Sequence, residues 1–143
     1  VKQNVIDSEW VPGVLDFIQL LKSNGIVTAN ITDLTAQIQF RKLVYFGLDE
    51  FFDYVVTSEE AGRDKPDRMP FKLALEKLQV PEEKVWMIGD SAESDIYGSN
   101  KNFKMTSIQK IHQGVEIGEG EFAPDLAFNN YHELEKLIKK LKT

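Results

Sequence analysis

The chain has no cysteine among its 143 residues, which excludes disulfide bonds and thiolate metal sites. It lacks any apolar run approaching the roughly 20 residues that span a bilayer, and its N-terminus shows no secretory signal pattern. Basic side chains are fewer than acidic ones, 17 against 23, and the net charge of −6 argues against an extended nucleic-acid surface. We therefore expect a cytoplasmic protein that binds neither nucleic acid nor a membrane.

The composition fits one globular domain. Hydrophobic residues make up 42% of the chain and charged residues 28%, which is typical of a soluble fold of about this length. We divide the chain into an N-terminal segment, residues 1–10, which has no clear period, and a core, residues 11–143. The first residue is Val1 rather than methionine, so the chain either begins inside a longer protein or has an N-terminus altered by processing or cloning.

Helix and strand patterns alternate along the core. Helices are predicted at about 12–24, 33–46, 70–78, 93–101 and 131–141, strands at 26–31, 54–57, 84–88, 104–108 and 126–128, and polar loops at 58–68 and 110–124. This alternation predicts an α/β, Rossmann-like fold with a parallel sheet and right-handed crossovers. Ligands of such folds bind beyond the carboxyl ends of the strands, so the residues just after each strand are the candidates for a site.

One such candidate is the motif Gly-Asp-Ser-Ala-Glu-Ser-Asp at residues 89–95, which follows an apolar strand and opens a helix. Asp90 stands at the strand end, and Asp95 lies on the next helical turn, near enough to share a site. Two carboxylates close together suit a magnesium ion. The alternative is an ordinary helix N-terminus, where the helix dipole favours acidic residues.

Two further polar features follow predicted strands. Lys65, next to Pro66 in a loop, could neutralise a phosphoryl group or a carboxylate, although a lysine in such a loop is usually a surface residue. Thr32 and the backbone N–H groups beside it at a helix N-terminus could bind an anion. Either Thr32 or Asp33 could instead serve as a helix cap.

In this order the three features resemble the signature of the haloacid dehalogenase-like hydrolase superfamily, and most of all its phosphoglycolate-phosphatase-like subfamily. The likeness extends over about residues 11–141. It is carried by Thr32-Asp33, Gln39, Lys42-Leu43, Gly47-Leu48, Phe52-Asp53, residues 56–60 (VTSEE), Lys65-Pro66-Asp67 with Phe71, and Gly89-Asp90-Ser91 with Asp95-Ile96 and Gly98.

The resemblance implies a Mg²⁺-dependent phosphatase that acts on a small phosphorylated metabolite. Asp90 would ligate the cation, and Asp95 would assist through a metal-bound water or by orienting Lys65. Ser91 is a weaker candidate, for a contact behind these groups. The resemblance therefore implies that Asp90 and Asp95 are the metal-binding residues.

The resemblance also implies a phosphate site. Thr32 and the Asp33 backbone would hold the phosphoryl oxygens, and Lys65 would neutralise charge between the nucleophile and the phosphate. Thr32 and Lys65 are thus the catalytic residues that the resemblance assigns to this chain.

The family's nucleophile is not found in the sequence. In the family it is the first aspartate of an Asp-x-Asp-x-Thr motif after a central strand, and it forms an aspartyl-phosphate. The chain contains no Asp-x-Asp, and Asp7-Ser8-Glu9 is the nearest imitation. We therefore predict that the first, central strand and the helical cap domain are missing and that the isolated chain is inactive.

Three alternatives remain open at this point. The chain is either a fragment of a longer protein or is completed by a second chain or copy. The parent enzyme could be a 2-haloacid dehalogenase-like hydrolase, which uses the same fold without a metal. The chain could also be a non-catalytic interaction domain derived from such an enzyme.

Overall fold

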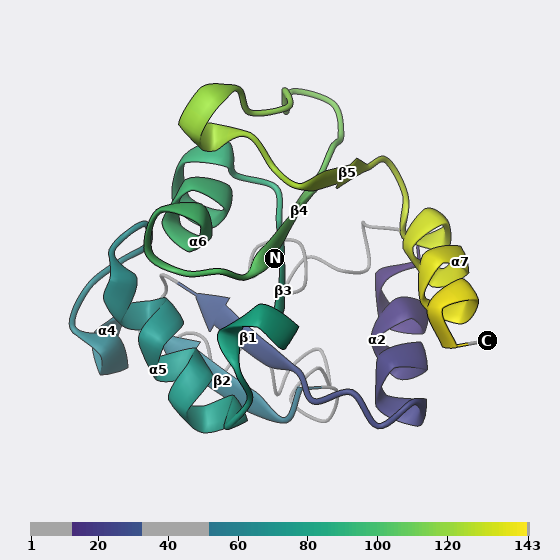
Figure 1. Ribbon diagram of the computed structural model, residues 1–143, viewed down its shortest axis with the longest axis horizontal. Helices are drawn as coiled ribbons and strands as arrows, with labels where there is room; N and C mark the ends of the chain where they lie inside the picture. Colours follow the sequence, from purple (N-terminus) through teal and green to yellow (C-terminus); the bar gives the residue numbers. More distant parts are fainter. Residues whose placement is uncertain (1–12, 33–51, 143) are drawn as a thin grey trace.

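A computed structural model describes residues 13–32 and 52–142 of the chain (Figure 1). The predicted helix at 33–46 and the imitation motif at residues 7–9 lie outside the described residues. The helices are α2 (Val14–Ser23), α4 (Ser58–Ala61), α5 (Arg68–Leu78), α6 (Tyr97–Asn102) and α7 (Tyr131–Lys142), and the strands are β1 (Ala29–Thr32), β2 (Tyr54–Thr57), β3 (Trp86–Gly89), β4 (Thr106–Lys110) and β5 (Leu126–Phe128). Shorter turns are η3 (Glu82–Lys84), η4 (Ala92–Ile96) and η5 (Gly120–Phe122).

Every strand pair among the described residues is parallel, as the alternating pattern predicts. β1 pairs with β2, while β3, β4 and β5 form a second sheet in that order. In register, Thr32 faces Thr57 at the end of the first pair, and Gly89 faces Gln109 near the end of the second. The α/β, Rossmann-like fold class is therefore confirmed.

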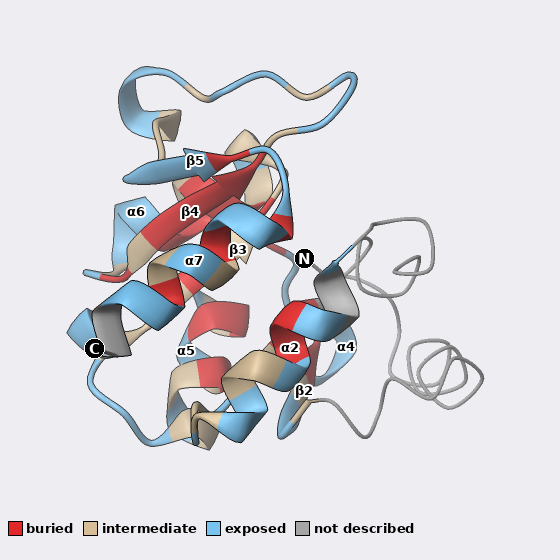
Figure 2. Cartoon of the chain, turned by 90° about the vertical axis from the view of Figure 1, so that its right-hand side faces the viewer, coloured by how far each residue is buried: buried red, intermediate tan, exposed pale blue. Residues whose placement is uncertain are grey.

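Helices cover both faces of the strands. Side chains alternate in direction along each strand, so each strand presents apolar side chains to both faces. On β3, Met87 packs in one core with Phe71 and Ala74 of α5. Trp86 and Ile88 point the other way, toward a second core between the strands, α2 and α7. In Figure 2 parts of α2 and α7 are coloured as buried, and the remainder of both helices is mostly exposed or intermediate. The result is a sheet layer between two helix layers.

A cavity of about 630 Å³ lies between the two sheets. Its walls include residues of β1 and of β3, and apolar side chains of α2, α5 and α7 close it. On β1, Asn30 is completely buried, and neither its amide nitrogen nor its amide oxygen has a hydrogen-bond partner among the described residues. The edges of β1 and β3 thus lie around one largely apolar space.

Several boundaries differ from the sequence prediction. β1 begins at Ala29 rather than at residue 26, and β4 covers 106–110 rather than 104–108. The segment 58–68, predicted to be a loop, contains α4, because the Thr57 hydroxyl accepts a hydrogen bond from the Glu60 N–H and caps this turn. α5 begins two residues early for a related reason, since the Asp67 carboxylate accepts a hydrogen bond from the Met69 N–H.

Within the described ranges, no helix combines the length and the apolar character that a bilayer crossing requires.

Candidate active site

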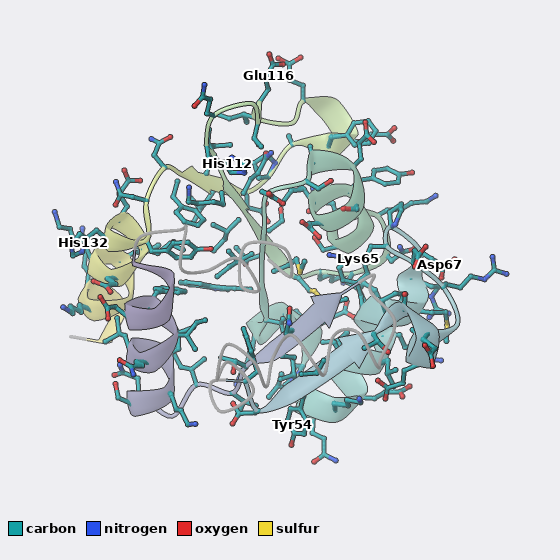
Figure 3. All side chains as sticks on the ribbon, turned by 180° about the vertical axis from the view of Figure 1, so that it is seen from behind. Tyr54, Lys65, Asp67, His112, Glu116 and His132 are labelled. Carbon is teal, nitrogen blue, oxygen red and sulfur yellow. The ribbon has the colours of Figure 1, made fainter. Side chains whose placement is uncertain are left out.

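A buried ion pair connects the carboxyl ends of the two sheets. Lys65, in the loop after α4, places its Nζ 2.5 Å from Oδ1 of Asp95 in η4, and the two side chains are 2% and 3% exposed. The residues are 30 positions apart in the sequence. In Figure 3 Lys65 lies toward the interior, whereas Asp67 lies at the periphery. Because Lys65 follows β2 and Asp95 follows β3, this contact places the carboxyl ends of β2 and β3 at the same rim.

The turn after β3 aims Asp95 at this position. η4 is a π-helical turn in which the Ser91 carbonyl accepts hydrogen bonds from the N–H groups of Asp95 and Ile96. The Ser91 N–H in turn donates to Oδ2 of Asp95 over 3.2 Å. Gly89 leaves the space that the carboxylate needs, since a Cβ atom there would overlap Asp95. A π-turn of this kind is common at functional sites.

The electrostatic balance at Asp95 favours the ionised form. Burial alone raises the pKa of the Asp95 carboxyl. Neighbouring positive charge, including the Lys65 ammonium, and hydrogen bonds from Lys65 and the Ser91 N–H outweigh burial, and the pKa of Asp95 is lowered below its usual value. Lys65 is therefore held at the strand ends by an anionic partner.

Asp90 lies next to this pair and has a different environment. Its side chain is 25% exposed, and Oδ2 lies 3.1 Å from Nε2 of His112, which is 40% exposed. Oδ1 of Asp90 has no hydrogen-bond partner among the described residues. The backbone carbonyl of Asp90 accepts a hydrogen bond from the buried side chain of Gln109 at 3.1 Å. One carboxylate oxygen thus remains open at the rim.

The negative charge of Asp90 shifts the pKa of two buried side chains, Tyr131 and Lys110. Burial raises the pKa of the Tyr131 hydroxyl, and the negative charge of Asp90 raises it further. Burial lowers the pKa of Lys110, against the opposing effects of Asp90 and Glu133. The Lys110 ammonium donates a hydrogen bond to the Ile111 carbonyl at 3.0 Å. On one side, therefore, Asp90 has the buried side chains of Tyr131 and Lys110 within range of its charge. Its own carboxylate remains partly exposed.

The predicted site residues are brought together in part. Lys65 and Asp95 are in contact, Asp90 is adjacent, and Ser91 caps η4 by accepting a hydrogen bond from the Ser94 N–H. Thr32 ends β1 opposite Thr57 in the register, and its side chain lies outside the described part of the chain. Asp33 lies outside the described residues.

Sequence reasoning missed His112 and Gln109. With the strand predicted to end at residue 108, Gln109 fell just outside it, and His112 fell into the glycine-containing stretch 110–124 that was predicted to be a loop. The structure extends β4 to Lys110, so Gln109 lies near the end of the strand and His112 lies two residues beyond it. The rule that sites gather at strand ends would have found both residues if the boundary had been right.

The residues at the rim fit a hard divalent cation. Among residues 13–32 and 52–142, no cluster of three or more His, Cys, Asp or Glu side chains is arranged to hold a metal. A magnesium ion does not need such a cage, because it commonly binds one or two carboxylates and keeps several waters or phosphate oxygens. The open Oδ1 of Asp90 meets this requirement, while both oxygens of Asp95 are engaged with Lys65 and Ser91.

Comparisons with known proteins agree with this geometry. Residues 1–109 match the family described as haloacid dehalogenase-like hydrolase. A relative named ribulose-1,5-bisphosphate 5-phosphatase, from Halopiger xanaduensis, is 39% identical over 63% of this chain and 38% of its own length. The pyrimidine 5'-nucleotidase of Escherichia coli is 35% identical over 91% of this chain and 57% of its own length. The chain thus spans about half the length of these relatives or less.

The fold is shared with a solved structure of the same kind. The crystal structure of a phosphatase from Thermococcus onnurineus aligns with a TM-score of 0.79 at 28% identity, over 89% of this chain and 57% of that one. The family match covers more than half of the chain, and the parallel α/β fold agrees with it. The chain therefore belongs to the haloacid dehalogenase-like hydrolases.

Proposed function

We propose that the complete enzyme is a Mg²⁺-dependent phosphatase that hydrolyses a small phosphomonoester through an aspartyl-phosphate. The observation that carries the proposal is the buried Lys65–Asp95 pair beside the open carboxylate of Asp90. An ammonium and a cation-binding carboxylate at one rim suit phosphoryl transfer, which depends mainly on positioning and on charge stabilisation. Relatives named as phosphatases support the substrate class.

Each candidate site residue has a role in this proposal. Lys65 neutralises the charge that builds up between the nucleophile and the phosphoryl group, and Asp95 holds the ammonium in place. Asp90 holds the cation through Oδ1, and a bound magnesium ion would supply Lewis-acid stabilisation of the phosphoryl oxygens. Thr32 and the Asp33 backbone remain proposed phosphate contacts.

We further propose that the nucleophile comes from a strand that lies in the cavity between β1 and β3. A parallel strand there would join the two sheets into one and would bring its carboxyl end to the rim of Asp90 and Lys65. The apolar walls of the cavity suit a strand that is buried on both faces. In this proposal the 143-residue chain has negligible turnover by itself.

Hydrolysis of para-nitrophenyl phosphate tests the proposal. The chain would be assayed alone, and also fused behind the N-terminal segment of a family member that carries the Asp-x-Asp-x-Thr motif. We expect turnover from the fusion with MgCl₂ and none from the chain alone or after addition of EDTA. Lys65→Met should lower kcat by about 10²–10³-fold, as does loss of one charge-stabilising donor in other enzymes.

Two comparisons make this assay decisive. Asp90→Asn should abolish most of the activity, whereas Lys72→Met, at an exposed position of α5, should change it little. A folded fusion that is inactive, or one whose activity survives both Lys65→Met and Asp90→Asn, would overturn the proposal. Release of halide from a 2-haloacid in the presence of EDTA would instead show the dehalogenase.

A further inference from the structure

The loop between β4 and β5 is fastened to the rim by a single buried side chain. Gln109 is completely buried, although it is polar and lies near the end of β4. Its Nε2 donates hydrogen bonds to the carbonyls of Asp90 and Glu116 at 3.1 and 3.0 Å. Its Oε1 accepts the Gly118 N–H at 3.0 Å. One amide thus ties the main chain of Asp90 to two points of the loop.

The loop is fitted closely around these bonds. A Cβ atom at Gly118 would overlap the Phe122 carbonyl and would approach Cβ of Ala92 to 2.9 Å. Ala92 begins η4, the turn that also carries Asp95. The Phe122 ring lies 4.9 Å from the ring of Tyr97, which anchors the far end of the loop on α6. The loop can therefore reach its position only with glycine at residue 118.

The same loop delivers the residue that contacts the Asp90 carboxylate. His112 approaches Oδ2 of Asp90 to 3.1 Å, while its Nδ1 lies 3.2 Å from the Gln113 carbonyl. Gln109 therefore acts on Asp90 along two routes, directly through the main-chain carbonyl and indirectly through the loop that holds His112. The first route holds the main chain of Asp90, and the second holds the imidazole that engages Oδ2 and leaves Oδ1 open.

We propose that Gln109 is a positioning residue, which holds Asp90 and the 111–119 loop so that Oδ1 of Asp90 faces the cation. This inference rests on the proposed function, since it assigns the geometry of the same metal site. Groups that orient a metal ligand without touching the metal typically change its affinity about 10–100-fold when they are removed. Gln109→Leu, which keeps the approximate shape but none of the hydrogen bonds, should weaken magnesium binding by that factor.

The test is a titration of the ¹⁵N-labelled chain with MgCl₂, followed through the amide signals of residues 89–91. The second variant is Gly118→Ala, which displaces the loop from Gln109 without altering the buried amide itself. The matched control is Asn100→Ala. Asn100 also fastens the loop's far end, through a hydrogen bond of 2.8 Å to the Ala123 carbonyl, but it is exposed and lies away from Asp90.

Hydrogen exchange of the Gly118 amide supplies a readout that does not depend on the metal. We expect slow exchange in the wild type and in Asn100→Ala, and fast exchange in Gln109→Leu. Magnesium affinity should fall at least tenfold in Gln109→Leu and in Gly118→Ala and should remain unchanged in Asn100→Ala.

Each other outcome counts against the inference in a recognisable way. Wild-type affinity in Gln109→Leu or in Gly118→Ala would overturn the positioning role and leave the metal site standing. An equal loss in Asn100→Ala would show a general effect of loop anchoring and would also overturn it. A wild-type chain whose signals at 89–91 do not respond to MgCl₂ would overturn the metal site of the proposed function together with the inference.

Discussion

Breaking the Lys65–Asp95 pair from one side should cost more stability than removing both charges. The two side chains are 2% and 3% exposed and 2.5 Å apart, so either charge left alone would be buried without a counter-ion. Removing one partner of a buried pair typically costs about 3–5 kcal/mol, whereas replacing both by apolar groups is often neutral or stabilising. We expect Lys65→Met and Asp95→Asn each to lower the free energy of unfolding by that amount, and Lys65→Met/Asp95→Leu to lower it much less.

Urea unfolding followed by circular dichroism measures these differences at pH 7. The pH dependence of the unfolding free energy tests whether the ionised form of Asp95 is the stabilising one. Because the pKa of Asp95 is lowered in the folded state, its contribution is complete above the unfolded value of about 3.9 and is lost as the pH falls through the folded value. The gap between wild type and Asp95→Asn should therefore narrow in acid. Losses that simply add in the double variant, or a gap that widens in acid, would refute this reasoning.

Two further substitutions test the surroundings of the site by the same unfolding assay. Gly89→Ala should lower the free energy of unfolding by about 1–3 kcal/mol, because the new Cβ atom would overlap the Asp95 carboxylate, and an unchanged stability would contradict the tight fit. Asn30→Leu should raise it by about 1–3 kcal/mol, because the buried amide has no partner among the described residues and an unpaired buried polar group carries a cost of that size. A loss of stability would show that Asn30 has a partner beyond those residues.

The sequence was sufficient for the features that depend on local patterns. The strand at 54–57 was predicted correctly because an apolar run between polar segments is a short-range signal. The parallel order of the strands followed from their alternation with helices. The predicted strands and their parallel order placed Lys65 in the loop after the strand at 54–57 and Asp90 after the strand at 84–88, and hence at candidate positions for a site.

The features that depend on distant contacts could not be predicted. A lysine beside Pro66 is normally exposed, and Lys65 is buried because a carboxylate 30 residues away compensates its charge. Gln109 and Lys110 are polar and were left outside the predicted strand at 104–108, yet both are buried in β4. Hydropathy cannot predict the burial of Gln109, since its hydrogen-bond partners are main-chain groups of Asp90, Glu116 and Gly118 that the fold brings close.

The burial of Lys65 and Asp95 is itself an argument for function. Transfer of two charges from water into the protein interior is costly, and apolar residues of similar size usually stabilise such a position at least as well. A pair that offers stability little advantage is nevertheless built with a π-turn, a backbone donor from Ser91 and a glycine at residue 89. These arrangements fix the direction of an ammonium group at a strand end before any substrate arrives, which is what electrostatic catalysis requires of its donors.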